Sequence, residues 1–176
     1  MQLKNSRSHF GVVSIVFHWV MAILLITLLA LGLYMTSLPI NPDTIELYGW
    51  HKELGMLVLM LVIARSIWRV SNVIPRLALP WWEALAARVV HYLFYVFMFA
   101  LPITGWLMSS AAGFPVSFFN WFIFPDLISP NPNLMKLLEQ IHEWLAYGLI
   151  ATTCLHILAA LKHHFIDKDD IMRRMM

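Results

Sequence analysis

Two histidines, His142 and His156, lie fourteen residues apart in the run HEWLAYGLIATTCLH, which is otherwise almost wholly apolar. In an α-helix, fourteen residues rise about 21 Å and end about 40° short of whole turns. Both imidazoles would therefore lie on one side of a single helix, near opposite ends. Imidazole binds metals and exchanges protons, and ionisable groups in apolar segments usually face a bundle interior and serve a site.

Two more histidines match these positions in depth. His18 lies several residues into an earlier apolar segment, in IVFHWVMA, and His51 lies at the start of the next one, in GWHKELG. Because consecutive spans run in opposite directions, we expect His18 at the level of His156 and His51 at the level of His142. A hydrogen bond between membrane helices contributes only about 0.6 kcal/mol on average, so hydrogen bonding alone hardly explains four histidines at matching depths.

Two imidazoles on facing helices, with apolar surroundings, favour haem iron with both axial positions filled. Such iron transfers electrons and has no open position for a ligand. Structural zinc would need four ligands, generally including Cys or carboxylates, and this interior does not supply them in number. Helix bundles commonly hold cofactors between facing side chains. The predicted metal ligands are therefore His18, His51, His142 and His156.

Arg65 follows His51 by fourteen residues, so it should share the face of that histidine and lie at the other level. A guanidinium fork suits a carboxylate, and we predict that Arg65 pairs with a haem propionate. The alternative is an ordinary basic residue at the membrane surface. Gly55 and Gly148 would leave room for a macrocycle, or would serve close helix packing.

Membrane-spanning helices must position these residues. Of the 176 residues, 60% are hydrophobic and only 12% are charged, and the mean hydropathy is +0.71, values outside the range of ordinary soluble domains. Crossing about 30 Å of hydrocarbon takes about 20 helical residues. Four segments are long enough, over residues 12–35, 54–70, 89–109 and 141–161. The predicted fold is an all-α integral membrane protein, with one domain over residues 1–176 that forms a four-transmembrane-helix bundle enclosing two haems.

The basic residues are unevenly divided between the two ends of this bundle. The end that holds both termini carries ten of the twelve, namely Lys4, Arg7, Arg65, Arg69, Arg76, Arg88, Lys162, Lys168, Arg173 and Arg174. The opposite end carries only Lys52 and Lys136. Since basic loops stay on the cytoplasmic side, we expect both termini in the cytoplasm. Topology accounts for these charges, and a nucleic-acid partner is not expected.

Two features remain open at this point. The longest connection contains FPVSFFNWFIFPDL, over residues 114–127, and its aromatic content is typical of a membrane-interface segment. It would alternatively cap a cofactor. His91 lies near the inner start of the third segment, where it would neighbour a quinone or a propionate, or serve as a structural histidine at the interface.

The chain resembles the bacterial di-haem cytochrome b561 family, whose members include membrane-bound superoxide oxidase. The resemblance covers nearly the whole chain and is carried by FHW at 17–19, HKELG at 51–55, LPITG at 101–105, HEW at 142–144 and LHILAALKHH at 155–164. It implies a bundle with two b haems, ligated by the pairs described above. It also implies exchange with ubiquinone at the inner side, where the family has a histidine at the position of His163.

The resemblance implies an oxidoreductase of the bacterial inner membrane that passes electrons from an outer donor, which is superoxide in superoxide oxidase-like members, to ubiquinone. One feature weakens the superoxide prediction, because the outer end has two lysines against six carboxylates, a formal balance of −4. An anionic substrate is helped by a positive funnel. The alternative is a cytochrome subunit that anchors a redox partner protein, a peripheral dehydrogenase or hydrogenase, and links it to the quinone pool.

Overall fold

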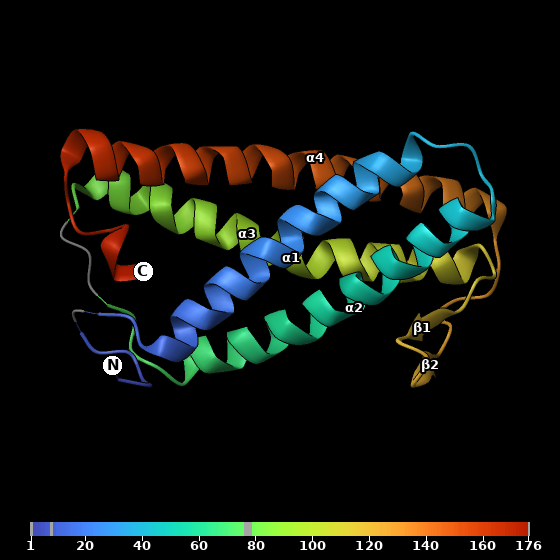
Figure 1. Cartoon of the computed structure of the whole chain (residues 1–176), viewed down its shortest axis with the longest axis horizontal. Coiled ribbons are helices and arrows are strands. Elements are labelled where there is room, and N and C mark those ends of the chain that lie inside the picture. The colour runs from blue at the N-terminus through green and yellow to red at the C-terminus, as the bar shows by residue number, and fades with distance from the viewer. Residues whose placement is uncertain (1, 8, 76–78, 176) are drawn as a thin grey trace.

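The computed structural model describes residues 2–7, 9–75 and 79–175. Within these residues the chain forms four long helices, which are α1 (Val12–Thr36), α2 (Pro42–Val70), α3 (Trp81–Ala111) and α4 (Pro132–Lys162). They run alternately up and down, and both termini lie at the same end of the bundle (Figure 1). The prediction of four helices is confirmed. Arg76, one of the basic residues counted above, lies outside the described residues.

Each helix contains its predicted apolar span, and α2, α3 and α4 extend well beyond it. Asparagine caps explain two of these early starts. The Asn41 side chain accepts a hydrogen bond from the backbone N–H of Thr44, and Asn131 accepts from the N–H groups of Asn133 and Leu134. Each cap is followed by a proline, which fits the first helical position because its missing N–H needs no partner there. His51 consequently lies well inside α2 and not at its start.

The close helix pairs are α1 with α2, α2 with α3, and α3 with α4. The core is small, and its main cluster is formed by Met21 of α1, Val58 and Val62 of α2, and Met98 of α3. No comparable close packing joins α4 to α1 or α2 in the described part of the chain. Contact between α4 and the first two helices therefore depends on long side chains.

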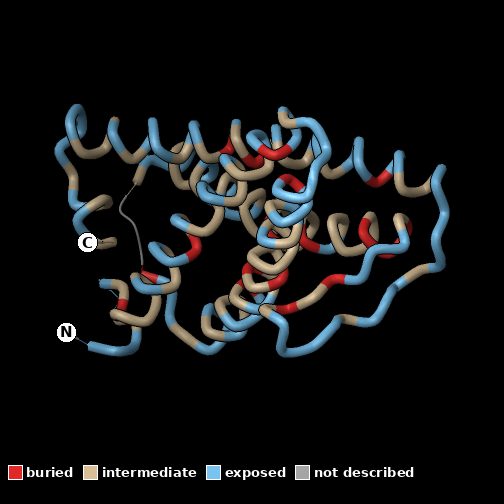
Figure 2. Tube along the Cα trace, turned by 45° about the vertical axis from the view of Figure 1, so that its right-hand side comes forward, coloured by how far each residue is buried: buried red, intermediate tan, exposed pale blue. Residues whose placement is uncertain are grey.

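Most residues of the helices are exposed or only partly buried (Figure 2), and many large apolar side chains are among the exposed ones. Three helical segments are long and apolar enough to cross a membrane, namely Val12–Thr36, Trp81–Ala111 and Pro132–Asp167. Only 6%, 6% and 11% of their apolar windows are buried inside the protein. Exposed apolar area of this extent marks a surface in contact with lipid. The 29-residue α2 is apolar in its middle and charged towards its ends, and it does not meet the same criterion.

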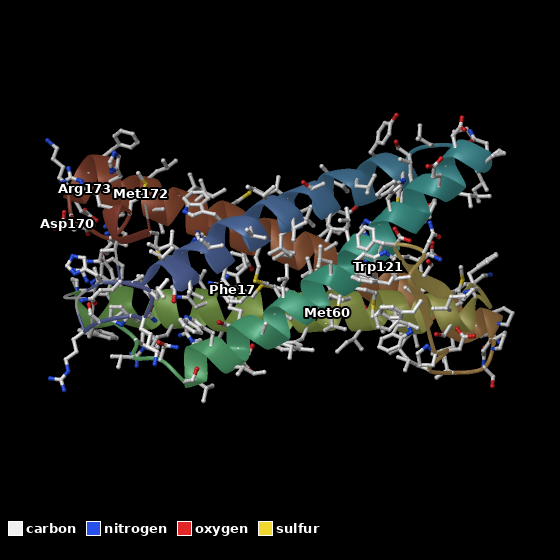
Figure 3. All side chains as sticks on the ribbon, turned by 60° about the horizontal axis from the view of Figure 1, so that its bottom comes forward. Phe17, Met60, Trp121, Asp170, Met172 and Arg173 are labelled. Atoms are coloured by element: carbon white, nitrogen blue, oxygen red, sulfur yellow. The ribbon has the colours of Figure 1, made fainter. Side chains whose placement is uncertain are left out.

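The aromatic connection forms a small β-hairpin of β1 (Val116–Phe118) and β2 (Phe122–Phe124). Its tight turn uses positive φ angles at Phe119 (48°) and Asn120 (60°). Val116 and Phe118 are buried against Met56 of α2, whereas Trp121 is 82% exposed. The hairpin lies at the end of the bundle opposite the termini, and Trp121 is found there (Figures 1 and 3). One face thus packs on the helices and the other is open, as expected of an interfacial segment.

Both chain ends are tied to the bundle. The Asn5 side chain donates to the carbonyl of Val73 (3.0 Å) and accepts from the Gly11 N–H (2.8 Å) and the Ser14 hydroxyl (2.7 Å). At the other terminus, the Trp19 indole donates to the carbonyl of Met175 (2.7 Å). The end that holds both termini is called the inner end below, and the hairpin end is called the outer end.

Candidate functional site

The four predicted ligand histidines form two pairs. At the outer end, His51 of α2 faces His142 of α4, with ring centroids 6.2 Å apart. At the inner end, His18 of α1 faces His156 of α4, with centroids 6.1 Å apart. The two pairs thus link α4 to α2 and to α1, the two helices against which α4 does not pack closely. The arrangement is the one that helical periodicity predicts, with two levels on one face of α4.

These separations can be compared with the requirement of a metal between two imidazoles. A ring nitrogen lies about 2.0 Å from such a metal, and the ring centre lies about 1.2 Å farther, so two opposed rings have centroids about 6.4 Å apart. The outer and inner pairs, at 6.2 and 6.1 Å, are close to this value. The donor set also suits low-spin haem iron, which takes two axial imidazoles. Both pairs therefore fit a b haem.

Thr104 of α3 determines the orientation of the His142 ring. Its hydroxyl donates to the carbonyl of Ala100 (2.8 Å) or Leu101 (3.0 Å), and its oxygen lies 3.0 Å from Nδ1 of His142. Since the hydroxyl proton is used on the backbone, Nδ1 of His142 is the donor to the threonine oxygen. The lone pair of the imidazole is then on Nε2, which is the atom left to bind a metal.

Two glycines lie directly against the outer rings. A Cβ added to Gly32 of α1 would lie 3.3 Å from Cε1 of His51, and one added to Gly105 of α3 would lie 3.3 Å from Cε1 of His142. Nδ1 of His51 faces the same α1 backbone, where it is buried and has no hydrogen-bond partner among the described residues. Both rings therefore depend on close approach to a neighbouring helix.

The glycines singled out from the sequence have other surroundings. A Cβ on Gly148 would lie 2.8 Å from Cζ of Phe97, so Gly148 allows close packing of α4 on α3. A Cβ on Gly55 would meet nothing within 4 Å. Of the two readings left open, helix packing holds for Gly148. Gly32 and Gly105 are the glycines that contact the outer histidines. Gly105 is the last residue of the LPITG motif, but the sequence alone does not indicate that it contacts His142 of another helix.

His91 of α3 lies in the inner layer, and its ring centroid is 5.9 Å from that of His156. Phe94, one turn later on the same helix, also contacts His156 edge to face, with centroids 5.3 Å apart. The inner level thus contains three imidazoles, and the rings of His18 and His91 both lie close to that of His156. The sequence placed His91 near this level without deciding its role.

Arg65 lies at the inner level, close enough to interact electrostatically with both His18 and His156. Its guanidinium makes only a long contact with the sulfur of Met21 (3.7 Å) among the hydrogen bonds of the described residues. The Tyr95 hydroxyl is buried beside it and makes no hydrogen bond of ordinary geometry. Arg69 lies over the Tyr95 ring at 5.5 Å.

These three side chains line a cavity of about 50 Å³ at the inner end. Its remaining lining is mostly aromatic or small, and it is formed by Asn5, Phe10, Ser14, Phe17, Trp68 and Ile74. Arg65 is only half-exposed and has no carboxylate partner among the described residues, and a cation in such surroundings is costly unless an anion joins it. The cavity is therefore suited to an anionic group such as a carboxylate.

His163 lies beyond α4, at the first position of the π-helical turn η1 (His163–Asp167). Its Nδ1 is 2.7 Å from a carboxylate oxygen of Asp169 and 3.2 Å from one of Asp167. The structure places this histidine at the inner end, as the sequence predicts, and it adds the acidic partners.

Comparison with known proteins agrees with this geometry. A family model described as prokaryotic cytochrome b561 matches residues 9–176. Cytochrome b561 homolog 2 of Escherichia coli (strain K12) is 37% identical over 186 aligned positions, which cover 100% of this chain and 95% of that protein. Cytochrome b561 homolog 1 of the same organism is 30% identical, covering 96% and 97%. A protein of Yersinia pestis named probable superoxide oxidase CybB is 31% identical over 72% of each chain.

Long apolar helices that carry facing histidines at two levels define the class of helical membrane cytochromes of b type. This chain belongs to the prokaryotic cytochrome b561 family. The family binds b haems and transfers electrons in membranes. The predicted resemblance is therefore confirmed.

Proposed function

We propose that the chain crosses the bacterial inner membrane four times, holds two b haems, and passes electrons from an outer donor to ubiquinone at the inner side. The observation that carries this proposal is the pair of facing imidazoles at each of two levels, 6.2 and 6.1 Å apart. His51 and His142 would hold one haem, and His18 and His156 the other. A haem held by two of these histidines would supply a one-electron carrier.

In this proposal α2 is the fourth span. Its charged residues cluster towards its two ends, and the stretch from Leu54 to Ala64 between them has no charge. Its buried residues Met56, Val58 and Val62 pack within the bundle, so part of its apolar surface faces the other helices and not lipid. The excess of basic residues at the end that holds both termini supports a cytoplasmic location for that end.

Arg65 would bind a propionate of the inner haem. The support for this role is its place beside His18 and His156 and the small cavity that it lines with Arg69 and Tyr95. Within the described ranges, Arg65 also has no carboxylate partner. A carboxylate placed there would compensate the buried guanidinium and give the Tyr95 hydroxyl a partner.

Superoxide is the donor that we favour, because one relative is named a probable superoxide oxidase. The reaction would be two superoxide, one ubiquinone and two protons giving two O₂ and one ubiquinol. At the outer end, Lys52 supplies a positive charge at the position directly after the predicted haem ligand His51. Its ammonium group donates to the Ser109 hydroxyl and the Pro115 carbonyl, both at 3.3 Å, so it also secures the hairpin.

The second candidate is a cytochrome subunit that links a peripheral dehydrogenase or hydrogenase to the quinone pool. The acidic outer end favours this candidate, because six carboxylates against two lysines do not attract a small anion.

A direct experiment separates the two candidates. Purified full-length protein with its haems is mixed with ubiquinone, and superoxide is generated in a pulse. Ubiquinol formed faster than in a protein-free control supports the superoxide reaction. If the haems are reduced by dithionite and reoxidised by ubiquinone, while superoxide gives no ubiquinol above the control, the anchoring function is favoured.

A further inference from the structure

The π-helical turn after α4 brings His163 and Asp169 into contact at the inner end. Nδ1 of His163 is 2.7 Å from Oδ2 of Asp169. The His163 side chain is only 12% exposed, and that of Asp169 is 31% exposed. Imidazole and carboxylate therefore meet in a partly enclosed position, where their interaction is stronger than on an open surface.

The backbone fixes the position of the Asp169 carboxylate. Lys168 has a left-handed conformation with φ of 53°, which reverses the chain after the π-helical turn. The Asp169 N–H then donates to the carbonyl of His163 (3.2 Å), and Oδ1 of Asp169 accepts from the Ile171 N–H (3.0 Å). One carboxylate oxygen is thus held by the backbone, while the other bonds to the imidazole.

The other charged groups around His163 are engaged with one another. Lys162 binds Asp167 (2.6 Å) and also Glu83 of α3 (3.0 Å). Asp167 lies 3.2 Å from Nδ1 of His163 and shares Lys162 with Glu83, whereas the contact of His163 with Asp169 is shorter, at 2.7 Å. Asp169 makes no other ion pair among the described residues. The donor atoms of His163, Asp167 and Asp169 lie within 4.8 Å of one another, a spacing that a metal ion could use, but the Lys162 ammonium opposes a further cation.

This geometry determines which ring nitrogen can exchange a proton. A carboxylate accepts, so Nδ1 of His163 carries a proton and donates it to Asp169. Nε2 is then the nitrogen that can take up or release a proton, and the carboxylate holds the ring in this orientation.

We propose that Asp169 is a positioning residue for His163, which it holds in the tautomer whose Nε2 passes protons from the inner aqueous side to ubiquinone. This inference rests on the proposed function, in which ubiquinone is reduced near His163. Each ubiquinone that becomes ubiquinol takes up two electrons, supplied by two superoxide anions, and two protons, which this histidine relays one at a time.

The test measures ubiquinol formation from superoxide by the full-length, haem-loaded protein between pH 5.5 and 9. For Asp169→Ala we expect kcat to fall by about 10-fold or more, while the haem spectrum stays unchanged. Asp169→Glu should restore part of the rate.

The matched control is Asp170→Ala. Asp170 is 69% exposed and pairs with Arg173 at 3.5 Å, and both residues lie at the same end of the bundle (Figure 3). This variant should keep the wild-type rate and pH profile. An Asp169→Ala protein with the wild-type kcat and pH profile would overturn the positioning role.

His163→Ala separates this inference from the function on which it rests. If His163→Ala abolishes ubiquinol formation and Asp169→Ala does not change it, only the role of Asp169 is wrong. If His163→Ala retains the full rate, proton delivery by this histidine is wrong, and the role of Asp169 is wrong with it. If wild-type protein gives no ubiquinol from superoxide above the protein-free control, superoxide as the donor is overturned, whatever the two variants do.

Discussion

Thr104 and His142 connect α3 to α4 at the outer end, through a 3.0 Å contact between the threonine oxygen and Nδ1 of the imidazole. The threonine hydroxyl donates to its own helix one turn back, so the ring must donate to the threonine oxygen. A side chain outside the ligand set thereby fixes both the direction and the tautomer of a predicted ligand.

Replacing this hydroxyl should weaken the outer haem site. In Thr104→Val the ring loses its acceptor while side-chain volume is kept, and haem affinity at the outer site should fall by about 10-fold or more. The measurement is haem retained per protein during dilution with a haem-scavenging apoprotein. Thr104→Ser, which retains the hydroxyl, should behave like the wild type, and equal loss in both variants would contradict this role.

A methyl group added to Gly105 should disturb the same site from the adjacent position. The Cβ of Gly105→Ala would lie 3.3 Å from Cε1 of His142, tighter than an ordinary contact, so the ring or α3 must shift. We expect lower outer-haem occupancy or a changed low-spin signal in electron paramagnetic resonance. Gly55→Ala is the matched control, because its Cβ would meet nothing within 4 Å. A normal signal from Gly105→Ala would show that the ring tolerates the methyl group.

Arg65 should influence the inner haem and leave the outer haem unaffected. In Arg65→Gln a positive charge beside the inner pair is lost, which favours oxidised iron and lowers the midpoint potential of that haem. A redox titration followed by visible spectroscopy checks this outcome, with the outer haem as internal reference. Arg88→Gln is the matched control, because Arg88 is exposed and bonds to the Ala84 carbonyl of its own helix. Equal shifts of both haems would argue against the propionate site.

Removal of one ligand from α4 should remove one haem. His142→Ala is expected to lower the haem content from two to one per chain by loss of the outer haem, and His156→Ala by loss of the inner haem. Pyridine haemochrome assay gives the content, and the remaining spectrum identifies the haem that stays. His164→Ala, beyond the end of α4, should keep both haems. One haem remaining with the same spectrum in both variants would contradict the assignment of separate layers.

Sequence periodicity was sufficient for the helices and for the two histidine levels. Fourteen residues bring His142 and His156 to the same face of any regular helix, and the alternation of spans then pairs them with His18 and His51. The location of Arg65 at the inner level follows from the same fourteen-residue spacing after His51. These predictions needed only the helical repeat and the order of the apolar segments.

Features that depend on contacts between helices could not be predicted in the same way. Gly105 lies against His142 because of the relative rotation of α3 and α4, which no single segment determines. Thr104 was hidden for the same reason, although it stands in the LPITG motif. The Asp169 contact requires a π-helical turn and a left-handed Lys168, neither of which has a clear signal in the sequence. The early helix starts at Asn41 and Asn131 were readable, because a capping asparagine followed by proline is a helix-start signal.

The central claim is that two histidine pairs hold two b haems in one chain, and a combined haem and protein assay of the purified full-length protein tests it most directly. Pyridine haemochrome absorbance, divided by protein from amino-acid analysis, should give about two haems per chain, and electron paramagnetic resonance should show two low-spin ferric species. One haem per chain, or a high-spin signal from protein that has kept its fold, would contradict the assignment of His18, His51, His142 and His156 as axial ligands.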